Sequence, residues 1–166
     1  TGRLNTRDIL QLPAETKPTA KFREAFQYQN IMFLAAGECV AAAQKLPWTK
    51  VVRERILNPL GMKNSTFSIM EMRTREDYAE GYSLTGDGAT LTGPREILAI
   101  APAGAINSSA REMSQWVRLL LRKGEWNGRQ LIKPELFEEL YKSRITVGPK
   151  VGYSLGWFVR DWNGHK

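Results

Sequence analysis

The sequence predicts a mainly α-helical chain with a few short β pieces. Apolar residues recur at helical spacing over two long stretches, residues 28–44 and 109–121. The alternation typical of a strand is confined to short pieces, of which residues 153–159 are the clearest. Residues 63–103 are rich in glycine and show no sustained period. These patterns favour helices joined by irregular loops, in a single domain or fragment over residues 1–166.

The first predicted helices lie in the N-terminal part of the chain. Thr6 is expected to cap a short helix that is followed by a proline-containing loop at residues 12–19. Residues 28–44 predict a central, tightly packed helix with a stripe of mostly small side chains, Met32, Ala35, Ala36, Cys39, Val40 and Ala43. A third helix is expected to begin near Pro47 and to end at the sequence Asn58-Pro59-Leu60-Gly61.

The later elements carry clearer boundary signals. Gly86-Asp87-Gly88 is a plausible hairpin turn. Ser109 and Glu112 predict a capping box, and Gly124 is expected to close the helix that follows. The apolar stripe of that helix consists of Met113, Trp116, Val117, Leu120 and Leu121. A short helix is expected from residue 134 to 141, and residues 153–159 are expected to form one strand.

Composition excludes several classes of function. The formal net charge is +7, but the basic residues are interleaved with acidic ones, which indicates a solvated mixed surface and argues against nucleic acid as a partner. No apolar run approaches the roughly 20 residues of a membrane span. A single cysteine, Cys39, and a single histidine, His165, argue against an internal disulfide and a metal centre, so we expect no metal and no cofactor.

One candidate for chemistry is Ser154, within Gly152-Tyr153-Ser154-Leu155-Gly156. This pattern matches the G-x-S-x-G nucleophile elbow, in which a turn from strand to helix exposes a reactive serine. The residues after Ser154 continue as a strand, which favours an ordinary small-residue strand start. An α/β-hydrolase with Ser154 as nucleophile is kept as an alternative.

A second candidate is Tyr28-Gln29-Asn30, at the start of the small-residue helix. The helix dipole and a neighbouring lysine would favour a phenolate there, and such a tyrosine can take a proton from a serine nucleophile. Asn30, two residues later, could hydrogen-bond a substrate amide. The tripeptide by itself favours a packed aromatic at a helix start.

Several blocks in order along the chain resemble the serine beta-lactamase and penicillin-binding-protein-like family, and within it the class C beta-lactamases and related esterases. They are Phe26-Gln27-Tyr28-Gln29-Asn30 with the helix after it, Asn58-Pro59-Leu60-Gly61-Met62, and Pro102-Ala103-Gly104 leading into the capped helix. The resemblance implies the helical portion of the α/β (α+β) beta-lactamase/transpeptidase-like fold. It also implies that Tyr28 and Asn30 are the catalytic tyrosine and asparagine of that family.

The other two elements of the family's site have no match in this sequence. No Ser or Thr has Lys three positions later, as S-x-x-K requires, and no K-T-G or H-x-G strand is present. The resemblance therefore implies a fragment of a serine hydrolase that cleaves an amide or ester through an acyl-enzyme, with a small-molecule ester, beta-lactam or peptide as substrate. This chain alone would be inactive. The alternative is a catalytically inactive binding or interaction domain. Oligomeric state and compartment stay open.

Overall fold

The computed structural model describes residues 4–86 and 88–164. Asp87 and His165, both considered above, lie outside the described residues. The chain is mainly helical with short strands, as the sequence predicts. The elements run in the order α1 (Thr6–Gln11), η1 (Leu12–Glu15), α2 (Asn30–Gln44), α3 (Trp48–Val52), η2 (Arg53–Leu57), α4 (Ile69–Met72), β1 (Tyr82–Thr85), β2 (Gly88–Leu91), η3 (Leu98–Ala103), α5 (Ala110–Leu121), β3 (Glu125–Trp126), β4 (Arg129–Gln130), α6 (Pro134–Tyr141), β5 (Ile145–Gly148), β6 (Val151–Tyr153) and β7 (Phe158–Arg160).

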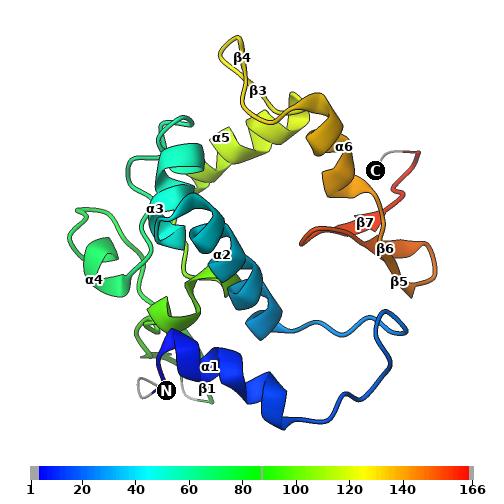
Figure 1. Ribbon diagram of the computed structural model, residues 1–166. Helices are drawn as coiled ribbons and strands as arrows, with labels where there is room; N and C mark the ends of the chain where they lie inside the picture. Colours follow the sequence, from blue (N-terminus) through cyan, green and yellow to red (C-terminus); the bar gives the residue numbers. More distant parts are fainter. Residues whose placement is uncertain (1–3, 87, 165–166) are drawn as a thin grey trace. The chain divides into compact units, whose positions relative to one another are not determined.

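Contacts between residues divide the chain into two compact units. Unit 1 consists of residues 1–15 and 29–115, and it contains α2 with the elements that pack on it, α1, α3 and η3 (Figure 1). Unit 2 consists of residues 16–28 and 116–166, and it contains α6 and the strands β3 to β7. The chain thus leaves unit 1 after η1 and returns to it just before α2.

The N-terminal cap of α1 lies one residue earlier than Thr6, the predicted cap. The side chain of Asn5 accepts a hydrogen bond from the Asp8 backbone N–H at 3.0 Å, and the Asp8 carboxylate accepts one from the Asn5 N–H at 3.1 Å. Both partners of a capping box are therefore present. The Thr6 hydroxyl instead donates to the carbonyl of Ala99 in η3, at 3.0 Å, and so ties α1 to that segment.

The helix predicted at residues 28–44 is present as α2, but its buried face differs from the predicted stripe. Leu34 and Gly37 are buried, whereas Met32 and Val40 are 52% and 43% exposed and Cys39 is exposed. The reason is that α2 is apolar around most of its circumference, so periodicity alone does not select a face. Contacts with η3 and α3 make that selection.

Gly37 is the point of closest approach between α2 and η3. A Cβ atom built on Gly37 would lie 2.2 Å from Cγ of Pro102 and 3.2 Å from Cδ1 of Trp48. No side chain fits at that distance, because even methyl contacts in well-packed interiors are longer. Glycine at this position therefore lets Pro102 lie directly against the helix.

The segment after α2 follows the sequence expectation closely. Pro47 is the N-cap residue of α3, which runs without interruption into the π-helical turn η2. Val51, Val52 and Leu57 from these two elements are buried, and together with Leu60 they form part of the core of unit 1. Gly61 ends the segment with a left-handed backbone (φ 72°), a conformation that glycine adopts without strain.

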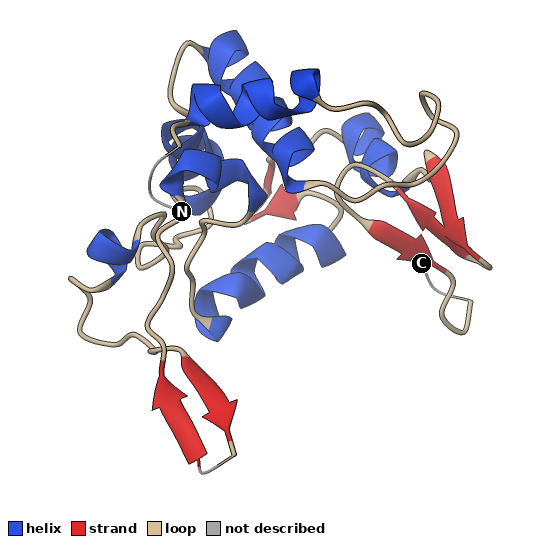
Figure 2. Cartoon of the chain, turned by 90° about the horizontal axis from the view of Figure 1, so that it is seen from below, coloured by secondary structure: helices blue, strands red, loops and turns tan. Residues whose placement is uncertain are grey.

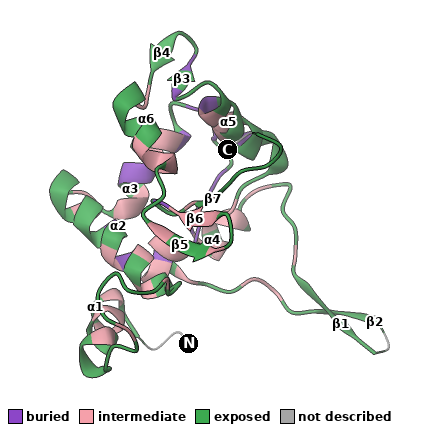
Figure 3. Cartoon of the chain, turned by 90° about the vertical axis from the view of Figure 1, so that its right-hand side faces the viewer, coloured by how far each residue is buried: buried purple, intermediate pink, exposed green. Residues whose placement is uncertain are grey.

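Strands β1 and β2 form a two-stranded antiparallel hairpin in which Tyr82 pairs with Leu91. Figure 2 shows the two strands extending from the loops of unit 1, and Figure 3 shows them exposed along their length. Leu84 is 91% exposed. The described strands of this hairpin thus add nothing to the buried core.

A buried carboxylate joins the loop after η2 to the first turn of α5. The Glu112 carboxylate is 7% exposed and accepts hydrogen bonds from the Asn64 N–H at 2.8 Å and the Ser65 hydroxyl at 2.7 Å. Ser108 lies 2.7 Å from the same hydroxyl oxygen and donates to it, because the single proton of Ser65 is used on Glu112. A two-way backbone bridge between Thr66 and Asn107, at 2.9 Å in each direction, lies beside this network.

The capping box predicted for α5 is therefore half present. Ser109 accepts a hydrogen bond from the Glu112 N–H at 3.2 Å, as expected. The prediction was that the Glu112 side chain would accept a hydrogen bond from the Ser109 N–H. It instead accepts hydrogen bonds from Asn64 and Ser65 in the loop after η2. The predicted apolar stripe of α5 is also largely open, because Met113, Val117 and Leu121 are exposed.

Unit 2 carries two small antiparallel sheets and the helix α6. Strands β3 and β4 form one sheet and β5, β6 and β7 form the other, in that order. Helix α6 has the predicted bounds and buries Phe137. The single strand expected at residues 153–159 is wrong: β6 ends at Tyr153 and β7 begins at Phe158. A tight turn between them is closed by the Ser154 N–H donating to the Trp157 carbonyl at 2.8 Å.

Replacing Gly37 with alanine tests the close approach of α2 and η3. The added methyl group would overlap Pro102, so Gly37→Ala is expected to lower the free energy of unfolding by about 1–3 kcal/mol. Gly86→Ala is the control, because nothing lies within 4 Å of a Cβ atom built there. Urea denaturation followed by circular dichroism measures both, and equal stabilities would contradict the packing described here.

The Glu112 network gives a second stability test. Glu112→Ala leaves the buried Ser65 hydroxyl and the Asn64 N–H without their charged acceptor, and we expect a loss of about 3 kcal/mol in unfolding free energy. Ser109→Ala removes only the cap and should cost about 1 kcal/mol. Glu112→Gln, which keeps one acceptor oxygen, should fall between wild type and Glu112→Ala. Thermal and urea unfolding of the three variants check this order, and it fails if Ser109→Ala is the most destabilised.

Candidate functional site

Tyr28 and Asn30, the residues that sequence analysis selects, lie at the start of α2. Gln29 is the N-cap residue and has an extended backbone, with φ −149° and ψ 123°. Asn30 is the first residue of the helix, and its side chain is exposed. Tyr28 precedes the cap and is 56% exposed. Both side chains are therefore accessible to a small molecule.

The division between the two units falls between Tyr28 and Gln29. Asn30 belongs to unit 1 and is the first residue of α2, the helix that packs against η3 and α3. Tyr28 belongs to unit 2, where Phe26, two residues before it, contacts Tyr153 and Phe158. Each of the two candidate residues is thus positioned by its own set of neighbours.

Tyr153 is a neighbour of Tyr28 that sequence analysis does not select as a site residue. Burial raises the pKa of the Tyr153 phenol above its ordinary value, and the charge of Tyr28 raises it further. The two phenols are therefore close enough for a negative charge on one to disfavour a charge on the other. The sequence carries no local signal for this neighbour, because Tyr28 and Tyr153 lie far apart in the chain.

Ser154, the alternative nucleophile, is buried and hydrogen-bonded to the end of α6. Its side chain is 4% exposed, and its hydroxyl contacts the carbonyls of Lys142 at 2.9 Å and Glu139 at 3.3 Å at the end of α6. It also lies in a turn between two strands, whereas a nucleophile elbow joins a strand to a helix. This geometry satisfies the last carbonyls of α6 and does not expose a reactive hydroxyl.

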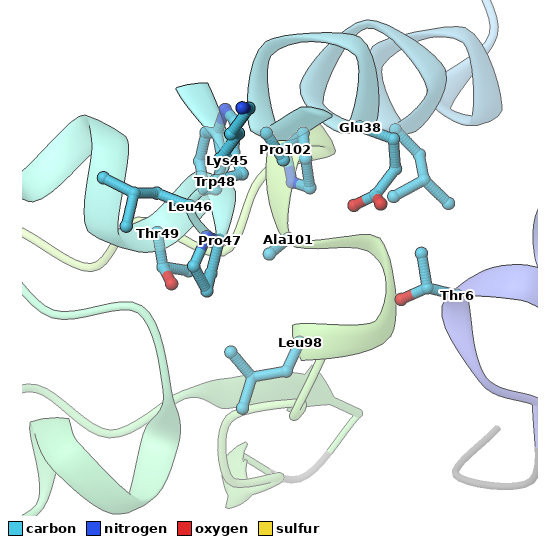
Figure 4. A pocket seen from close by; sticks show the side chains of 12 residues that line it. Thr6, Glu38, Lys45, Leu46, Pro47, Trp48, Thr49, Leu98, Ala101 and Pro102 are labelled. Atoms are coloured by element: carbon cyan, nitrogen blue, oxygen red, sulfur yellow. The ribbon is translucent and has the colours of Figure 1, made fainter. Parts of the chain in front are cut away.

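Unit 1 contains a cavity of about 550 Å³ between α2, α3 and η3 (Figure 4). Most of the residues that line it are apolar, and the oxygens of Glu38 and Thr6 point toward its open space (Figure 4). Neither Tyr28 nor Asn30 is among its lining residues. The cavity is thus a different place from the one where the catalytic pair is expected.

The described residues bear on two further classes of site. Over residues 4–86 and 88–164, no group of three or more His, Cys, Asp or Glu side chains is arranged to hold a metal ion. In the same part of the chain, each helix is too short or too polar to cross a lipid bilayer.

The role of Ser154 can be tested on the chain itself. A fluorophosphonate should form no adduct at Ser154, because the hydroxyl is buried and bonded to the end of α6. Ser154→Ala should lower the unfolding free energy by about 1 kcal/mol, as expected for the loss of one hydrogen bond. Intact-mass analysis after labelling measures the first effect and denaturation the second. Stoichiometric labelling that disappears in Ser154→Ala would establish the α/β-hydrolase alternative.

Comparison with known proteins identifies the relatives of this chain. Protein flp of Staphylococcus aureus (strain MW2) is 26% identical over 169 residues, which cover 96% of this chain and 31% of the relative. The octameric penicillin-binding protein homologue from Pyrococcus abyssi superposes with a TM-score of 0.78 at 22% identity, over 93% of this chain and 35% of that protein. A D-stereospecific amidohydrolase from Streptomyces sp. superposes with a TM-score of 0.77 at 23% identity, over 98% and 47%.

These similarities agree with the family expected from the sequence blocks. The two solved structures share the fold of this chain, and the chain spans about a third of the length of Protein flp. The sequence model described as Beta-lactamase matches residues 1–166. The chain therefore belongs to the Beta-lactamase family.

Proposed function

We propose that this chain is part of a serine hydrolase that cleaves an amide or ester bond through an acyl-enzyme. The observation that carries the proposal is the family match over residues 1–166 together with an exposed tyrosine and asparagine at the start of α2. The similar protein from Streptomyces is described as an amidohydrolase, which supports an amide carbonyl as the group attacked. A beta-lactam or an ester carbonyl would react in the same way.

In this proposal Tyr28 is the general base and acid, and Asn30 positions the substrate. A serine oxygen attacks the carbonyl carbon while its proton passes to the Tyr28 phenolate. The same proton then goes to the leaving nitrogen or oxygen as its bond to carbon breaks, which leaves the acyl group on serine. Water repeats the sequence and releases the acid. The Asn30 amide, exposed at the first residue of α2, donates to or accepts from the polar groups of the substrate.

The nucleophile and its lysine have to lie outside these residues, because no Ser or Thr in the sequence has Lys three positions later. The chain spans 31% of the length of Protein flp, which leaves room for such an element in a longer protein. The same observation favours a second candidate, a catalytically inactive binding domain of the family. The two differ in whether the longer protein turns over a substrate.

Substitution of Tyr28 in the longer protein that carries this chain tests its role. Tyr28→Phe removes only the hydroxyl, and kcat for a nitrophenyl ester and for a chromogenic cephalosporin should fall about 100- to 10,000-fold, the range for a positioned acid and base. Tyr141→Phe is the matched control, since Tyr141 belongs to unit 2 and packs its ring against Phe137 and Trp157.

Two outcomes would count against this proposal. A Tyr28→Phe protein with the full rate would remove Tyr28 from the mechanism. A wild-type protein that carries a serine and lysine element but hydrolyses neither substrate would favour the binding domain.

A further inference from the structure

Phe26 is the anchor of the segment that leads to Tyr28. Over the described residues 21–30, Phe26 is the only side chain that is not exposed. Its ring centroid lies 4.8 Å from that of Tyr153 and 5.9 Å from that of Phe158. Both distances fall in the range of favourable aromatic pairs, and the tilted and edge-on geometries are the preferred ones.

The two rings that receive Phe26 are held in place by the sheet. Tyr153 in β6 and Phe158 in β7 are directly paired across the strands, so their side chains stand on the same face. Their ring centroids are 5.0 Å apart with an edge-on interplanar angle of 73°. The three rings of Phe26, Tyr153 and Phe158 therefore contact one another pairwise, and we call this group the aromatic clamp.

The aromatic clamp lies two residues from Tyr28 along the chain. Residues 26–29 belong to no helix or turn, so no backbone ladder fixes this stretch. The ring contacts of Phe26 therefore limit how far Tyr28 can move from β6 and β7. The electrostatic effect of Tyr28 on Tyr153 agrees with that proximity.

We propose that the aromatic clamp positions Tyr28 for proton transfer, with Tyr153 as its principal positioning residue. The inference rests on the proposed function of Tyr28. A general base must lie within hydrogen-bond reach of the proton it takes, and a displacement of about 1 Å can cost a factor of about 100 in rate. The ring contacts of Phe26, two residues from Tyr28, limit such a displacement.

The first experiment uses the chain itself and needs no activity. The five tyrosines are labelled with ¹³C at Cζ, assigned by single Tyr→Phe substitutions, and titrated by NMR. Tyr28→Phe should lower the pKa of Tyr153, because it removes the charge that raises it. Tyr141→Phe should leave the pKa of Tyr153 unchanged, since burial alone raises the pKa of Tyr141 and its ring contacts are Phe137 and Trp157.

Phe26→Ala completes this experiment. It removes the contact that orients the segment, so the subsequent change of Tyr28 to Phe should no longer alter the pKa of Tyr153. The proposal is overturned if Tyr28→Phe leaves the pKa of Tyr153 unchanged in the wild-type background. It is also overturned if Phe26→Ala leaves the effect of Tyr28 intact.

The second experiment uses the longer protein with a nitrophenyl ester. Tyr153→Ala should lower kcat about 100-fold with little change in KM, because the base is displaced while the substrate site is not. Tyr153→Phe keeps the ring contacts with Phe26 and Phe158 and should restore kcat. Tyr141→Ala removes ring contacts of similar length elsewhere in unit 2 and controls for a general loss of stability.

The outcomes separate this inference from the proposed function. If Tyr28→Phe keeps its full rate while the pKa of Tyr153 falls, the clamp holds Tyr28 but the catalytic role fails. If Tyr28→Phe is inactive while Tyr153→Ala keeps its kcat, Tyr28 is catalytic and the clamp does not position it.

Discussion

The buried carboxylate of Glu112 is the interaction on which the core of unit 1 depends. It accepts hydrogen bonds from the Asn64 N–H and from the Ser65 hydroxyl, and burial removes the hydroxyl from water. In doing so it places the loop after η2 against the first turn of α5, beside the Thr66–Asn107 bridge. The apolar residues before and after that loop, Met62 and Phe67, are buried. A shorter side chain at residue 112 would leave the buried Ser65 hydroxyl without this acceptor.

Close backbone approach at Gly37 is the second constraint in unit 1. Because Pro102 occupies the space that a Cβ atom would need, the face of α2 that contains Gly37 is the buried one. Met32 and Val40 of the same helix are left exposed in this chain. An extended apolar surface on a helix that is short of polar residues is typical of a helix with packing neighbours on more than one side. This agrees with a chain that spans about a third of the length of Protein flp.

Asn30 and Tyr28 are each supported within their own unit. Asn30 is carried by a helix whose packing depends on Gly37, Pro102 and their neighbours. Tyr28 follows Phe26 by two residues, and Phe26 contacts an aromatic pair on β6 and β7. Packed neighbours of this kind hold a loop residue in place, which is one reason why loops on rigid elements commonly carry functional residues.

The sequence by itself determined the class of structure, most helix boundaries and the family. Pro47, Gly61, Gly124 and Pro134 mark ends of elements because their backbone preferences act locally, through at most a few neighbouring residues. The ordered blocks around Tyr28, Asn58 and Pro102 indicated the family, and the family model matches residues 1–166. Only the tertiary structure decided which face of α2 is buried, where the Glu112 carboxylate is directed, and that residues 153–159 form a turn between two strands. Those outcomes depend on contacts between residues far apart in the chain, such as Gly37 with Pro102 and Phe26 with Tyr153, and local periodicity carries no information about them.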